Sequence, residues 1–399
     1  MSISTYLNAM RDPAGLPTPA FVFDIFLVVT FALHILLVNL ALGSLGIILW
    51  GKVKNTEFSL KLSSSLSRLL VNSISWLIVL GVAPLLFIQV IYDPFWYTAN
   101  TLSAKWALYF LIFIALGFVL TYIYYLRGGY ESKGNLFWLI ISGIFFLLAA
   151  YVMHSLAVAQ LYPEKWPTFS VKNGIYISSG KYLHGFELFR FLHFIIPSLA
   201  VIGVWLLFYA KYFKGKYEED YLKWVERLGL HLALIFSLIQ GVVGFLWLIT
   251  LPSDLNFVSN PVFIIALVIA LLFIGYLFYS VKSTSPNSTL IGILLGITVL
   301  AMSAAREALR MSFFSKAGYT FADYPVNLSM GSLILFLLTF IMGLIVLLYV
   351  AIVAYRSGKG LREVGAHALG KASVFLLWFW ILIMVIIGIY ISIKNGVLF

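Results

Sequence analysis

Long apolar runs alternate with short polar stretches along the whole chain. A helix that crosses the hydrocarbon core of a bilayer needs about 20 consecutive, mainly apolar residues. Ten runs are long enough: Phe21–Trp50, Leu69–Tyr92, Trp106–Leu126, Leu136–Gln160, Phe189–Phe213, Leu228–Leu251, Val262–Val281, Leu290–Met311, Leu328–Tyr355 and Ser373–Ile393. The pattern predicts an all-α fold, a polytopic membrane bundle of about ten transmembrane helices.

The connections between these runs are short, and they suggest an orientation. Cytoplasmic loops of membrane proteins are enriched in Lys and Arg. Most of the 26 basic residues fall on one side of the membrane, and this places both termini outside. The longest connection, Leu161–Leu188, then lies outside and contains Trp166 and His184. We therefore expect a single integral membrane domain over residues 1–399, surrounded by lipid.

Composition narrows the function classes. Of the 399 residues, 62% are apolar and 10% charged, against about 45–50% and about 25% in a soluble domain. This excludes a soluble enzyme, and no nucleic-acid partner is expected despite the net charge of +11. The chain has no cysteine, which excludes Fe–S clusters, thiolate metal sites and covalently attached heme. Metal or redox chemistry would have to use His, Met or carboxylate ligands.

Three charged residues lie close together near the end of the eighth run: Arg306, Glu307 and Arg310. Charges at membrane depth are costly and often functional. Glu307 and Arg310 are three residues apart, so they share a helix face. Two interpretations remain open at this point. One is an internal ion pair, and the other is a carboxylate ligand or proton acceptor beside an anion that arginine holds.

Histidines provide the second signal. His34 lies midway along the first run, while His154 and His193 lie near the outer ends of the fourth and fifth. Imidazole is a good axial ligand for heme iron. Arg190, one turn before His193, could pair with a heme propionate, as could Arg306 and Arg310. The same spacing also fits a proton path.

Four segments resemble the large subunit of cytochrome bd-type oxygen reductases. They are the first-helix stretch from His34 to Gly43, the second-helix stretch from Leu80 to Gln89, Arg190-Phe-Leu-His193, and Glu307-Ala-Leu-Arg310. The resemblance implies two or three b-type hemes, with His34, His193 and Glu307 as ligands of heme iron. It covers a core of about 19–315, and the helices of 328–393 are additional.

The chain also departs from that family. The family's seventh helix supplies a Met ligand, but Val262–Val281 has neither Met nor His. Candidate partners for His193 are therefore His154, His184 and Met330. The long quinol-binding loop is replaced by the short connection Pro252–Pro261, and the third run has no carboxylate. Quinol as the direct donor and a standard oxygen-reducing site are both in doubt.

These observations predict a heme-binding electron-transfer subunit of a respiratory complex in a prokaryotic inner membrane. Its expected partners are a c-type cytochrome or another outer redox subunit, and a second bd-like membrane subunit. It would belong to an oxidoreductase, and reduction of oxygen or another small molecule stays open. The alternative is a heme-free quinone-binding anchor of the polysulfide-reductase type. A transporter or a purely structural anchor is the remaining interpretation, and no catalytic residue is assigned.

Overall fold

The computed structural model describes residues 2–131, 134–176, 180–359 and 367–396. Within them, every predicted run forms a helix long and apolar enough to cross a membrane. The spans are α2 (Ala20–Lys54), α3 (Glu57–Ile91), α5 (Ala104–Leu126), α6 (Leu136–Ala159), α8 with α9 (Leu188–Ile195 and Pro197–Tyr212), α10 (Glu219–Thr250), α11 (Pro261–Lys282), α12 (Ser288–Lys316), α13 (Met330–Gly358) and α14 (His367–Lys394). The chain is an integral membrane protein with an all-α bundle, as predicted.

The described chain divides into two compact units. The first contains Met1–Pro13 and Ala20–Tyr324, and the second contains Ala14–Pro19 and Pro325–Phe399. In the second unit the backbone of Leu16 pairs with the segment before α13. Its N–H donates to Pro325 O, and its C=O accepts from Asn327 N, both at 2.8 Å. Helices α13 and α14 form the rest of this unit. The single domain over residues 1–399 stays a prediction.

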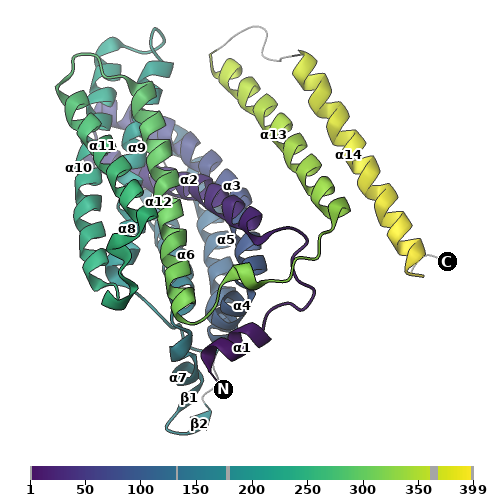
Figure 1. Ribbon diagram of the computed structural model, residues 1–399. Helices are drawn as coiled ribbons and strands as arrows, with labels where there is room; N and C mark the ends of the chain where they lie inside the picture. Colours follow the sequence, from purple (N-terminus) through teal and green to yellow (C-terminus); the bar gives the residue numbers. More distant parts are fainter. Residues whose placement is uncertain (1, 132–133, 177–179, 360–366, 397–399) are drawn as a thin grey trace. The chain divides into compact units, whose positions relative to one another are not determined.

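Short elements gather at one end of the first unit, which we call the cap end (Figure 1). They are α1 (Ile3–Ala9), α4 (Asp93–Leu102), α7 (Trp166–Ser170) and a hairpin of β1 (Val171–Lys172) and β2 (Ile175–Tyr176). Within the described residues, this hairpin is the one β-sheet, and the other elements are helices. The connection between α10 and α11 also lies at this end and forms two 3-10 turns, Ser253–Leu255 and Phe257–Ser259.

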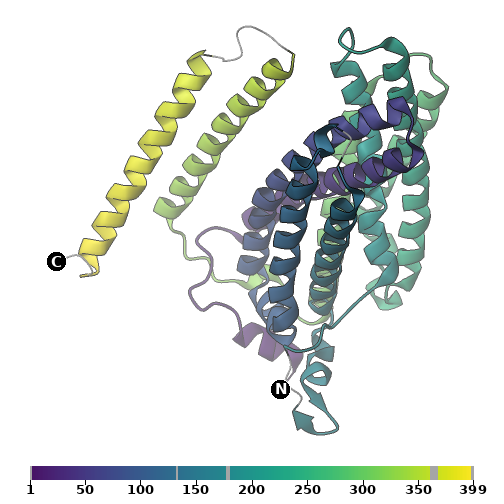
Figure 2. The same ribbon diagram turned by 180° about the vertical axis from the view of Figure 1, so that it is seen from behind.

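Helices α2 and α3 form the most extensive helix pair of the first unit and run side by side in the rear view (Figure 2). Small residues let their backbones approach closely. A Cβ on Gly51 of α2 would lie 2.4 Å from Ser63 Oγ of α3. Helix α3 begins well before its apolar run, because Thr56 and Ser59 form a capping box at its start.

The two prolines inside predicted spans behave differently. Pro84 lies within α3, which continues through it. Pro197 separates α8 from α9, with Ile196 in a turn between them. Proline has no N–H, so it leaves the carbonyl four residues earlier without its helical hydrogen bond. For Pro197 that carbonyl belongs to His193, and the break therefore falls beside a predicted ligand.

Candidate functional site

Glu307 is buried and fully paired. Its side chain is 4% exposed, and Arg310 NH1 donates to Oε2 at 2.8 Å. Tyr92, at the end of α3, donates its hydroxyl to Oε1 at 2.7 Å. A buried carboxylate needs such partners, because an unpaired charge in an apolar surrounding is very costly. The arrangement is complete as an internal ion pair, so Glu307 would have to exchange a partner before it could bind a metal.

Helix α2 brings an unforeseen carboxylate toward this pair. Ser303 of α12 donates to Val28 O of α2 at 2.8 Å, which sets the two antiparallel helices in register. One turn nearer the cap end on each helix are Asp24 and Glu307. The charge of Asp24 interacts with those of Glu307 and Arg310. Among the described residues, the buried Oδ1 of Asp24 has no hydrogen-bond partner.

Arg306, next to Glu307 in α12, contacts an aromatic ring of α2. Its guanidinium carbon lies 4.0 Å from the centre of the Phe31 ring on α2. Its Nε is buried and has no hydrogen-bond partner within the described chain. A cation over an aromatic face is stabilised, but the N–H still lacks an acceptor. Arg306 is thus a donor available to an anion.

His34 lies between α2 and α3, half-buried, with its ring against a glycine. Its Nδ1 is 3.0 Å from Leu77 O. A carbonyl oxygen can only accept, so Nδ1 carries the proton and Nε2 keeps its lone pair. This is the tautomer that metal-binding imidazoles adopt. A Cβ on Gly81 would lie 2.7 Å from His34 Cε1, so only glycine leaves room for this ring position.

His193 shows the same relation to α10. A Cβ on Gly244 would lie 2.7 Å from Cε1 of His193, and the ring centre is 5.4 Å from that of Trp247. Two ring nitrogens near this contact, His193 Nδ1 and Trp247 Nε1, are buried without hydrogen-bond partners in the described chain. Most buried polar atoms have a partner, so these two nitrogens are candidate contacts for a polar ligand.

Arg190, one turn before His193, also has buried nitrogens without hydrogen-bond partners in the described chain. Its side chain is 6% exposed, and its NH1 lies 3.9 Å from Glu187 Oε2, an ion pair too long for a hydrogen bond. Within the described residues, its Nε and NH1 have no acceptor. Its charge interacts with those of Arg306 and Arg310. Arg310 is paired with Glu307, so the N–H groups available to an anionic ligand are those of Arg190 and Arg306.

His154 belongs to a neighbouring polar group near the cap end. Its Nε2 accepts a hydrogen bond from the backbone N–H of Glu187 at 3.3 Å. Tyr162 donates its hydroxyl to Glu187 Oε1 at 2.9 Å. Because its Nε2 is engaged, His154 can bind iron through that nitrogen only after losing this bond. Of the other predicted partners of His193, His184 stacks on Phe169 at 4.2 Å, and Met330 begins α13 in the second unit.

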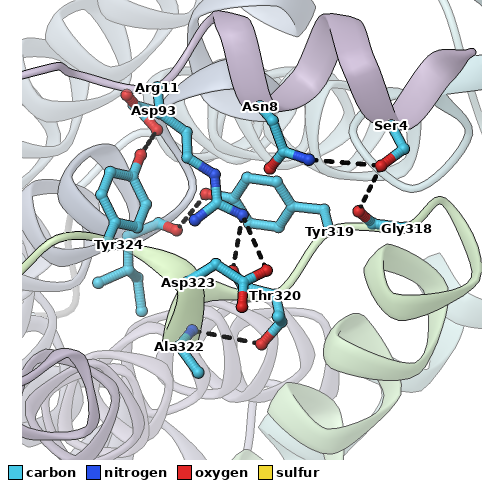
Figure 3. A network of polar contacts seen from close by, with 11 residues as sticks. Ser4, Asn8, Arg11, Asp93, Gly318, Tyr319, Thr320, Ala322, Asp323 and Tyr324 are labelled. Carbon is cyan, nitrogen blue, oxygen red and sulfur yellow. Dashed lines mark hydrogen bonds and ion pairs between the residues drawn. The ribbon is translucent and has the colours of Figure 1, made fainter.

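A second polar network ties α1 to the segment after α12 (Figure 3). Arg11 lies between two aromatic rings, 4.2 Å from the centre of Tyr319 and 4.7 Å from that of Tyr324. It donates to Thr320 O at 2.7 Å and pairs with Asp323 at 3.7 Å. Because these contacts join residues at both ends of the first unit's sequence, they fix the N-terminal segment against the segment after α12.

Asp93 is the buried carboxylate of this network. It accepts hydrogen bonds from the Tyr324 hydroxyl and from the backbone N–H of Asp12, the latter at 2.9 Å. Burial raises the pKa of Asp93 above its ordinary value, and the two hydrogen bonds partly oppose the shift. Sequence reasoning missed Asp93 and Asp24, although each is a carboxylate beside or inside a predicted span.

Comparison with protein families, with curated proteins and with solved structures finds no match to this chain. The site is therefore interpreted from its own geometry. Of the residues predicted as heme contacts, Arg306, Glu307 and Arg310 lie on α12, Arg190 and His193 on α8, and His154 on α6. His34 lies on α2, three residues beyond Phe31, the residue that Arg306 contacts.

Proposed function

We propose that this protein is a heme-binding electron-transfer subunit of a respiratory membrane complex. One observation carries the proposal: His193 and Arg190 leave buried ring and guanidinium nitrogens without partners in the described chain, one turn apart on α8. A b-type heme needs an imidazole for its iron and cations for its propionates. Both groups fit this set, and His34, with Nε2 free, fits a second heme.

When bound, heme supplies a one-electron redox centre. The chain's own residues then have distinct tasks. His193 would hold the iron through a ring nitrogen and His34 through Nε2, while Arg190 and Arg306 would pair with propionate oxygens. Arg310 pairs with Glu307, and Tyr92 orients the same carboxylate. Long apolar helices exclude water from these groups, which strengthens each electrostatic contact.

The partners in this proposal follow from the same placement. Arg190 and His193 lie toward the cap end, so we place the donor or acceptor there, as a c-type cytochrome or another redox subunit. A second bd-like membrane subunit would cover part of the apolar surface, in a prokaryotic inner membrane. The ten-residue connection 251–260 is too short to fold over a quinone. Menaquinol and reduced c-type cytochrome, supplied separately, would identify the donor.

A second candidate is the heme-free quinone anchor. A quinone headgroup needs polar partners for both oxygens at the end of the bundle. Tyr162, Glu187 and His154 offer a hydroxyl, a carboxylate and an imidazole in one place. Tyr162 already bonds to the Glu187 carboxylate and His154 to the Glu187 backbone N–H. Arg190 Nε and NH1 and His193 Nδ1, in contrast, have no hydrogen-bond partner among the described residues. The heme proposal therefore explains more of the geometry.

The His193→Ala variant tests the proposal, with His231→Ala as the matched control. His231 is exposed on α10 and its Nδ1 bonds only to Arg227 O in its own helix. We expect His193→Ala to remove one low-spin component of the reduced-minus-oxidised spectrum, because its iron loses a strong-field ligand. His231→Ala should leave the spectrum unchanged. A full spectrum in His193→Ala would exclude this residue as a ligand.

A further inference from the structure

The carbonyl of His193 would be an orphan without help from another helix. Pro197 is four residues downstream and has no N–H to give it. A buried carbonyl without a partner is destabilising. In the structure, Gln240 of α10 donates its amide Nε2 to His193 O at 2.8 Å. A side chain on a neighbouring helix thus completes the turn that proline breaks.

The same contact governs where the imidazole lies. Gly244 is one turn after Gln240 on α10 and faces the His193 ring, so α10 holds both the backbone and the ring of this residue. The other amide atom, Gln240 Oε1, is buried and lacks a partner among the described residues, as does His193 Nδ1. Iron-binding imidazoles generally rely on such neighbours to fix their orientation.

We propose that Gln240 is the positioning residue for His193: its amide replaces the backbone N–H that Pro197 lacks and fixes the turn that presents the imidazole. The spectroscopic part of this inference rests on the proposed role of His193 as a heme ligand. The structural part does not, because the orphaned carbonyl exists whether or not heme is bound. The two parts can therefore fail separately.

The test uses the variants Gln240→Leu, Pro197→Ala and their combination in the purified full-length protein. Gln240→Leu removes the donor at nearly constant volume, so we expect a lower Tm and a shifted or weakened low-spin α band. Pro197→Ala supplies a backbone N–H four residues after His193. In that background Gln240→Leu should change neither the Tm nor the band further. Leu238→Ala, at an exposed position of α10, is the control substitution.

If Gln240→Leu lowers the Tm as much in the Pro197→Ala background as in the wild-type background, the amide does not replace the missing N–H and the proposal is wrong. An unchanged Tm and spectrum in Gln240→Leu alone would also overturn it. Should the protein lack heme altogether, the Tm cycle still tests the amide, and only the proposed function fails. A Tm rescue without any spectral change in Gln240→Leu would show that the amide stabilises the helix break but does not position the ligand.

Discussion

Individual residues decide how Glu307 should be interpreted. Its two oxygens are satisfied by Tyr92 and Arg310, and removing one member of a buried ion pair costs about 3–5 kcal/mol because the other charge stays behind. We therefore expect Glu307→Gln to lower stability by roughly that amount and to alter the high-spin part of the spectrum. Heat denaturation followed by absorbance measures both effects.

The matched control is Glu219→Gln. Glu219 also pairs with a cation, Lys223 Nζ at 2.9 Å, but the two side chains are 81% and 64% exposed. Exposed pairs contribute little to stability because water screens them, so this variant should change stability little. If Glu307→Gln loses stability but keeps the wild-type spectrum, Glu307 is only an internal ion pair.

Asp93 sets a pH dependence at the cap end. Its pKa lies above the ordinary value of 3.8 because burial disfavours the carboxylate. The folded state therefore binds more protons than the unfolded state in the window above 3.8, and stability falls as pH rises through it. Asp93→Asn should remove this fall, at a cost of about 1–3 kcal/mol for the mismatched Asp12 N–H.

A series of Tm values across this acidic window provides the measurement for Asp93. Asp323→Asn is its control, since Asp323 belongs to the same network but its side chain is 60% exposed. Identical pH profiles for wild type and Asp93→Asn would exclude Asp93 as the titrating group.

At the scale of helices, the sequence pattern predicted all ten spans, because hydropathy over about 20 residues reports directly on burial in lipid. It did not predict the extra turns at the start of α3, because Thr56 and the serines there lower the mean hydropathy below that of a membrane span. Pro84 and Pro197 look alike in sequence, yet only Pro197 breaks its helix. Which neighbour can satisfy the freed carbonyl depends on tertiary contacts that a local pattern does not contain.

Glycines on facing helices give an element-scale prediction. A Cβ on Gly81 would press on the His34 ring at 2.7 Å, whereas one on Gly275 of α11 meets nothing within 4 Å. Overpacking costs about 1–3 kcal/mol, so Gly81→Ala should lower the Tm and displace His34. Under the proposed function it also changes a high-spin spectral component. Gly275→Ala is the control, and an unperturbed spectrum in Gly81→Ala would argue against His34 as a ligand.

For the whole molecule, the site could be predicted only in part. His34, His193, Arg190, Glu307 and both flanking arginines were found because polar residues are rare in apolar spans. Tyr92 and Gln240 were missed. Tyr92 lies at the end of a span, in a chain with many tyrosines, and Gln240 has a role only because Pro197 follows His193 by four residues. Such roles arise from the packing of separate helices.

Pyridine hemochrome analysis of the purified wild-type protein tests whether the chain binds heme. We expect a red preparation with a Soret band, reducible α bands and the hemochrome spectrum of b-type heme, which is extracted by acid acetone because no cysteine can hold it covalently. A colourless preparation that contains no extractable heme, yet binds menaquinone analogues, would contradict this expectation.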